Sequence, residues 1–345
     1  MKAIRGLATG IGSLPHKDAP AALDMIFKYL PDIPFWPQLP KRDVREGMVA
    51  QFCENLPCIK VAREGVFFDG SDQEKELENF YERIINKDVD YFKISPDFAE
   101  GLYAFKERLT KSNLNPIKEI KCHVVGPFTF AASLNDGEGR ALLHDPALMQ
   151  AITEGLAMKA LWQIKFLQEF GKGIIVFIDE PYLGCFGSAF TPLNRADVVS
   201  VLSDFTQRLR GAGGVRTGVH CCGNTDWSIF TEIPALDIIN FDAFNYLDRL
   251  LLYADDLAGF FESDRIFCWG IVPTQEFDDK ITAEALVGKI NAGIDILVEK
   301  GVNKSKISEN LLLSPACGLG TLDTGRSEKI LKLLQQVSLH IRKIA

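Results

Sequence analysis

Short apolar segments alternate with long amphipathic ones along the whole chain, and this alternation restricts the fold more than any other feature of the sequence. Eight segments have the length and the apolar, β-branched composition of strands: 7–12, 33–38, 121–126, 173–180, 216–223, 237–244, 265–272 and 310–318. Nearly continuous apolar strands are typical of parallel sheets that are covered on both faces. The segment 33–38 is the weakest of these predictions because its two prolines are poor strand residues.

The longer segments between the strands carry the signals of helices. The longest helix is expected from Asp145 to Phe170, because an aspartate followed by proline begins it and Gly171 follows it. Further helices are expected at about 195–211, 282–300 and 325–343. Strands and helices that alternate throughout, with eight candidate strands, favour a closed barrel over an open sheet.

We therefore predict that residues 1–345 form one α/β domain, a single eight-stranded parallel β/α (TIM) barrel. Such a barrel needs roughly 250 residues, so the remainder must be insertions. The region 41–115, in the N-terminal third, is the predicted insertion because its strand pattern is poor. Active sites of these barrels lie at the C-terminal ends of the strands, so each candidate residue is judged by that position.

Charge and composition exclude several classes of partner. The net charge of −8 argues against nucleic acid or an anionic membrane, because both are bound by basic patches. The N-terminus has no sustained apolar segment of a signal peptide, and no apolar run reaches the roughly 18 residues of a membrane span. A soluble, cytoplasmic protein is expected. In that reducing compartment its eight cysteines are more often buried, catalytic or metal-bound than paired.

One strand, "TGVHCCGNTDW" (217–227), combines a histidine with two cysteines. Alternate side chains of a strand share a face, so His220 and Cys222 point the same way and Cys221 points to the other side. Cys317, in "SPACGLGT", also closes a predicted strand, and in a barrel the ends of the fifth and eighth strands can converge. Zinc is commonly held by four nitrogen and sulfur donors. The fourth ligand would be a substrate atom or Asp242, near the end of the sixth strand.

Other candidate residues each allow a functional and a structural interpretation. Asp179 and Glu180 end a strand, so one of them is expected to face the barrel mouth and bind substrate; a solvated turn is the alternative. Ser13 lies in a turn, where a backbone role competes with substrate contact. Asn224 follows the metal-binding strand and is expected to orient His220 or its loop by hydrogen bonding. The cysteines themselves could be small buried hydrophobes.

Five segments resemble a known superfamily, in the same order along the chain. "HCCGNT" resembles the His-x-Cys-Gly-Asn segment of uroporphyrinogen decarboxylase-like barrels that transfer methyl groups from corrinoids. "SPACGLGT" and "GIGSLP" are similar to the Cys-Gly-Leu and Ile-Gly-Ser-Phe-Pro segments of cobalamin-independent methionine synthase. "FIDEP" is similar to the Ile-Asp-Glu-Pro of that enzyme, and "VGPFT" resembles the Gly-Pro-x-Thr of the superfamily.

The resemblance implies a zinc-dependent thiol methyltransferase on an eight-stranded barrel. By the same matching, His220, Cys222 and Cys317 would be zinc ligands, and Asp242 stands where the family has a glutamate ligand. Ser13 and Asp179 would hold the amino-acid head of a homocysteine-like acceptor.

Two departures from the family affect the expected substrates. The second, folate-binding barrel of methionine synthase has no counterpart, so a methylated corrinoid protein is the expected methyl donor. In "KRDVREGMVAQF", basic Lys41 and Arg42 lie near the position of a family glutamate that binds the acceptor's amine, which leaves room for an acidic thiol as acceptor. Two alternatives stay open: a zinc-free barrel that acts in binding or assembly, and a decarboxylase-type lyase.

Overall fold

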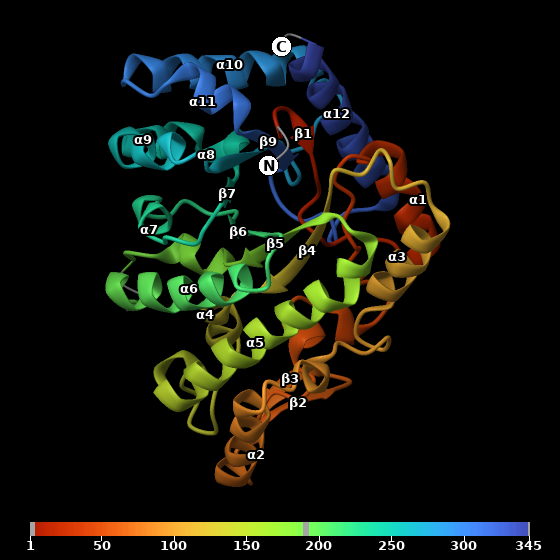
Figure 1. Cartoon of the computed structure of the whole chain (residues 1–345), viewed down its shortest axis with the longest axis vertical. Coiled ribbons are helices and arrows are strands. Elements are labelled where there is room, and N and C mark those ends of the chain that lie inside the picture. Colours follow the sequence, from red (N-terminus) through yellow and green to blue (C-terminus); the bar gives the residue numbers. More distant parts are fainter. Residues whose placement is uncertain (1–3, 189–192, 344–345) are drawn as a thin grey trace.

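A curled parallel sheet of seven strands forms the centre of the molecule, and helices cover its outer side (Figure 1). The computed structural model describes residues 4–188 and 193–343. The strand order is β1-β9-β8-β7-β6-β5-β4, and every neighbouring pair is parallel. The strands are β1 (Leu7–Ala8), β4 (Glu119–Val125), β5 (Gly173–Asp179), β6 (Val215–Cys221), β7 (Ile238–Phe241), β8 (Ile266–Val272) and β9 (Leu311–Pro315).

The segment 33–38, predicted as an eighth strand, forms isolated bridges instead. It lies between β1 and β4, where Phe35 bridges Lys121 of β4 and Gln38 bridges Ser13, both in the parallel sense. Prolines at positions 34 and 37 have no N–H to donate, so a continuous ladder cannot form here. The other seven predicted strands are confirmed, although β1 is much shorter than expected.

The four predicted helices are also confirmed. Asp145 caps the longest helix, α5 (Pro146–Leu167), because its carboxylate accepts from two backbone N–H groups of the first turn. This helix packs on β4 and on α6. The others are α6 (Arg195–Arg210), α10 (Ala283–Glu299) and α12 (Thr324–Lys343). In the part of the chain that the structure describes, no helix has the length and apolar character to cross a membrane.

Shorter helices complete the outer layer. They are α1 (Ala19–Tyr29), α4 (Pro127–Ala132), α7 (Ser228–Thr231), α8 (Ala243–Leu250), α9 (Ala254–Glu262) and α11 (Lys304–Glu309). Three of them, α4, α7 and α8, begin within seven residues of the C-terminal ends of β4, β6 and β7.

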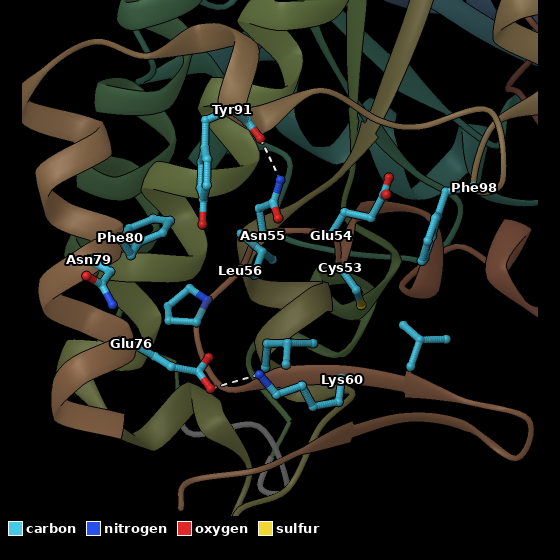
Figure 2. A pocket seen from close by; sticks show the side chains of 13 residues that line it. Cys53, Glu54, Asn55, Leu56, Lys60, Glu76, Asn79, Phe80, Tyr91 and Phe98 are labelled. Atoms are coloured by element: carbon cyan, nitrogen blue, oxygen red, sulfur yellow. Dashed lines mark hydrogen bonds and ion pairs between the residues drawn. The ribbon is translucent and has the colours of Figure 1, made fainter. Parts of the chain in front are cut away.

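The region 41–115 adds no strand to the seven-stranded sheet. It contains the antiparallel hairpin of β2 (Ile59–Ala62) and β3 (Gly65–Phe68) and the helices α2 (Gln73–Ile85) and α3 (Glu100–Lys111). The hairpin and α2 lie at the bottom of Figure 1. They line a cavity of about 470 Å³ together with the loop around Leu56 (Figure 2). None of the candidate site residues lines this cavity, so the cavity is separate from the candidate site.

An apolar cluster fills the inside of the curled sheet. It includes Phe177 of β5 and Ile238 of β7. Lys121 of β4 reaches the same space, where its ammonium lies 4.4 Å from the centroid of the Phe177 ring and donates to the carbonyl of Ile11. Gly218 of β6 leaves room for these side chains, since a Cβ there would lie 2.7 Å from the Phe177 ring and 3.2 Å from Ile238.

We expect the substitution Gly218→Ala to lower the free energy of unfolding by about 1–3 kcal/mol, because the added methyl group overpacks the interior of the sheet. Urea denaturation measures the change. Gly259→Ala is the matched control, because nothing lies within 4 Å of a Cβ at that position of α9. Equal stability of the two variants would contradict the tight packing around Phe177.

Candidate metal centre

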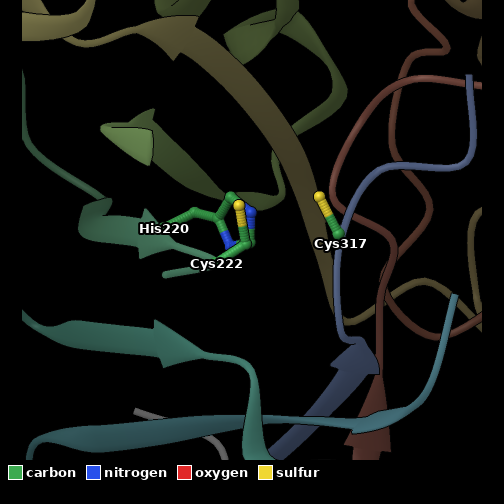
Figure 3. A group of neighbouring side chains, drawn as sticks. All are labelled: His220, Cys222 and Cys317. Carbon is green, nitrogen blue, oxygen red and sulfur yellow. The ribbon is translucent and has the colours of Figure 1, made fainter. Parts of the chain in front are cut away.

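Three potential metal ligands meet at the C-terminal ends of two strands. His220 belongs to β6, Cys222 directly follows it, and Cys317 lies two residues beyond β9. One imidazole nitrogen and the two sulfurs lie within 4.8 Å of one another, and Figure 3 shows the three side chains. The strands β7 and β8 separate β6 from β9 in the sheet, so only the curl of the sheet brings these ends together.

The alternation along β6 separates the two adjacent cysteines as predicted. Cys221 is fully buried in the main hydrophobic core, whereas Cys222 is half-buried and belongs to the metal-binding group. Burial raises the pKa of the Cys221 thiol to about 12. Cys221 is therefore a buried small hydrophobe, and His220 and Cys222 point to the site.

The three candidate ligands shift one another's pKa values through hydrogen bonds. Hydrogen bonds from Cys222 and His220 lower the pKa of Cys317 to about 4 despite its burial. The hydrogen bond to Cys317 in turn raises the pKa of Cys222. Burial lowers the pKa of His220, but the hydrogen bond to Cys317 and the charge of Asp179 outweigh it, so this pKa is raised. The lowered pKa favours the thiolate form of Cys317, and the thiolate is the form that binds a metal ion.

Asn240, which we did not predict, fixes the orientation of the His220 ring. It lies beside His220 in the register of β6 and β7, and its Oδ1 is 2.5 Å from Nδ1 of the imidazole. Its Nδ2 donates to the carbonyl oxygen of Cys268 at 2.9 Å and to Ser314 Oγ at 2.8 Å. A carbonyl oxygen only accepts, so the amide nitrogen must face Cys268 and the amide oxygen must face His220.

The predicted orienting residue, Asn224, is exposed in the turn after β6. The hydrogen bond to His220 comes from Asn240 instead. The two-residue period of a strand could have indicated that Asn240 faces the site. Asn240 is a polar residue two positions before Asp242 on β7, a strand that is otherwise apolar, so it shares a face with Asp242.

Asp242 lies outside the group formed by the two sulfurs and the imidazole. Its side chain is the N-cap of α8: one carboxylate oxygen accepts from the backbone N–H of Asn245 at 2.9 Å, and the other accepts from the Asn245 side chain at 2.8 Å. Both oxygens are therefore engaged in starting the helix.

Asp179 and Glu180 point in different directions at the end of β5. Asp179 pairs in register with His220, and its Oδ1 is buried without a hydrogen-bond partner. Burial raises the pKa of Asp179 to about 6, against the opposing effect of His220. Glu180 is fully buried and accepts from the backbone N–H groups of Phe128 and Thr129 at 3.0 and 2.8 Å. Asp179 therefore faces the site, and Glu180 holds the turn after β4.

Ser13 stands against the loop that carries Cys317. Its Oγ accepts from the backbone N–H of Gly320 at 3.2 Å, and its carbonyl oxygen accepts from Leu319 at 3.0 Å. A Cβ on Gly318 would lie 2.3 Å from Ser13 Oγ, so this loop passes in close contact. The structure thus gives Ser13 a role in holding the loop.

The two basic residues near the mouth are paired within the chain. The guanidinium of Arg42 contacts the carboxylates of Glu46 and Glu100. The Lys41 ammonium donates to the carbonyl oxygen of Leu322. The charge of Arg42 is therefore compensated by two carboxylates of the chain itself.

The whole chain resembles a solved structure. It is a B12-independent methionine synthase from Shewanella sp. W3-18-1 in complex with selenomethionine, which matches with a TM-score of 0.61 and 15% identity over 99% of each chain. This chain shares its fold with that methionine synthase. The predicted resemblance is thereby confirmed at the level of the fold. No protein-family model and no curated protein matches the sequence.

We expect the substitution Asp242→Ala to leave the zinc content unchanged and to lower the free energy of unfolding by about 0.5–2 kcal/mol, the usual loss for an N-cap. The reason is that its oxygens cap α8 and stay outside the group of donors. Elemental analysis and thermal unfolding provide the two measurements. A stoichiometric loss of zinc in this variant would make Asp242 a ligand after all.

Zinc binding to the metal-free protein at about pH 6 should release about two protons per chain. One comes from the Cys222 thiol and one from His220, because the pKa values of both groups are raised. Cys317 contributes none, since a pKa of about 4 leaves it deprotonated. Calorimetry in buffers of different ionisation enthalpy counts the protons. A release of about three would contradict a thiolate at Cys317.

Proposed function

We propose that this chain is a zinc-dependent methyltransferase that moves a methyl group from a corrinoid to a thiol acceptor. The convergence of His220, Cys222 and Cys317 carries the proposal, because one imidazole nitrogen and two sulfurs are a donor set that suits zinc. The shared fold with a B12-independent methionine synthase supports the methyltransferase part of the proposal, whereas the corrinoid donor rests on the sequence resemblance alone.

His220, Cys222 and Cys317 would hold the ion. Bound zinc would keep the acceptor's sulfur deprotonated at neutral pH, where a free thiol with a pKa of about 8.5 is mostly protonated. Catalytic zinc sites provide three protein ligands and leave one position for water or substrate. Because the carboxylate of Asp242 is engaged in capping α8, we assign that position to the acceptor.

The surroundings of the site favour an acceptor that carries an amine, such as homocysteine. The buried Oδ1 of Asp179 has no partner in the chain, and an ammonium group of the acceptor would supply one. Arg42 is compensated by Glu46 and Glu100, so it offers little to the carboxylate or sulfonate of an acidic thiol. Ser13 would act through the loop of Cys317 that it holds.

Two further parts of the proposal rest on the sequence resemblance. The methyl donor would be a methylated corrinoid protein, as in the corrinoid-linked barrels that the "HCCGNT" segment resembles. The barrel would close through the bridged segment 33–38 in the place of an eighth strand, with 41–115 as an insertion. The two isolated bridges to the neighbours of that segment support this closure.

The test combines metal content with an assay of methyl transfer. We expect about one zinc per chain in the freshly purified protein and its loss in Cys222→Ser and Cys317→Ser. The wild type should methylate homocysteine with methylcobalamin as donor, and both variants should lose this activity. Cys185→Ser is the matched control, because that thiol is exposed and outside the metal-binding group.

Absence of zinc from the wild type, even after reconstitution with the metal, would contradict the proposal. The chain would then be a zinc-free binding or assembly protein, or a lyase on the same fold. Zinc binding without methylation of any thiol would support the metal centre and contradict methyl transfer from a corrinoid to a thiol.

A further inference from the structure

We propose that Asn240 is a positioning residue that joins the two halves of the metal centre and sets the tautomer of His220. The inference rests on the proposed zinc site, which consists of one half on β6 and another half after β9. Asn240 belongs to neither half, but its side chain contacts His220 of the first half and Ser314, three residues before Cys317 of the second.

The amide of Asn240 connects four neighbouring strands. The residue lies on β7 and is fully buried. Its Oδ1 contacts His220 of β6, and its Nδ2 donates to the main chain of β8 at Cys268 and to the side chain of Ser314 on β9. All the hydrogen-bonding atoms of this side chain are thus engaged across the inside of the sheet.

The contact with Cys268 decides the tautomer of the imidazole. A main-chain carbonyl cannot donate, so a reversed amide of Asn240 would place its oxygen against the carbonyl oxygen of Cys268. The amide oxygen therefore requires an N–H at Nδ1 of His220. The lone pair of the neutral ring then lies on Nε2, the atom left to bind a metal.

The contact with Ser314 ties this arrangement to Cys317. Ser314 lies three residues before Cys317, and its hydroxyl donates to the carbonyl of Pro315 at 2.9 Å. The neighbouring strand β8 has a register shift at Gly270, where a Cβ would lie 2.9 Å from the Cα of Ala316. The segment that leads to Cys317 is therefore held closely, by Asn240 from inside the sheet and by the main chain of β8 alongside.

Three substitutions separate the two roles of Asn240. Leucine has a similar shape and no hydrogen-bonding group, so Asn240→Leu removes both roles. Aspartate still accepts from Nδ1 and cannot donate to Cys268, so Asn240→Asp preserves the tautomer and breaks the link to β8 and β9. Ser314→Ala removes only the contact with β9.

The first measurement is nitrogen NMR of labelled histidine in the metal-free protein, followed through a pH titration so that the neutral form of the His220 ring is identified directly. We expect the Nδ1–H tautomer of His220 in the wild type, in Asn240→Asp and in Ser314→Ala. In Asn240→Leu the ring should lose this preference. A role of Asn240 in packing alone would leave the tautomer unchanged.

The second measurement is the zinc dissociation constant, obtained by competition with a chromophoric chelator. Loss of an orienting partner typically weakens metal binding by 10- to 100-fold, so we expect a loss of about that size in Asn240→Leu. Asn240→Asp and Ser314→Ala should lose less. Asn224→Ala is the matched control because that asparagine is exposed in the turn after β6, and its affinity should equal that of the wild type.

The outcomes separate this inference from the proposed function. A wild type that binds no zinc would reject the metal site, and the NMR experiment would still test the control of the tautomer. A wild type that binds zinc, beside an Asn240→Leu variant with the same affinity and the same tautomer, would overturn the inference alone. If Asn240→Leu does not fold, an affinity of Ser314→Ala and Asn240→Asp equal to that of the wild type would overturn it.

Discussion

Parallel pairing of the strands is the constraint on which the site depends. Because all seven strands of the sheet run in the same direction, their C-terminal ends lie along one rim. The curl of the sheet then brings the ends of β6 and β9 together across the two strands between them. An open, flat sheet with the same pairing would leave His220 and Cys317 apart. The meeting of these three side chains is thus a consequence of curvature as much as of the residues themselves.

The inside of the sheet is divided along the strands into an apolar part and a polar part. Phe177 and Ile238 belong to the apolar cluster, whereas Asp179 and Asn240, two residues further along the same strands, are polar. Parallel strands place residues of equal register at the same level, so the polar groups come together near the rim. Buried polar groups require hydrogen-bond partners, and the amide of Asn240 supplies one to each of His220, Cys268 and Ser314.

The three side chains of the candidate metal centre shift one another's pKa values. A thiolate at Cys317 is stabilised by the imidazole of His220 and by the thiol of Cys222, in a place where burial alone would favour neutral groups. A cation bound here would take over the compensation of this thiolate that His220 and Cys222 otherwise provide. A charged group at a buried position destabilises the fold unless it is compensated. These residues would therefore be unfavourable in a core with no other role.

The sequence by itself predicted the class of fold and the three candidate ligands that the structure brings together. Seven strands, four helices and the opposite directions of Cys221 and Cys222 follow from periodicity, which local backbone geometry imposes on any chain. Only the tertiary structure decided the rest. The segment 33–38 forms only isolated bridges to the segments on either side of it. The roles of Asn240, Asn224 and Asp242 depend on contacts with groups whose positions the sequence does not give. Periodicity tells on which face a side chain lies, but packing alone selects the partner that it meets there.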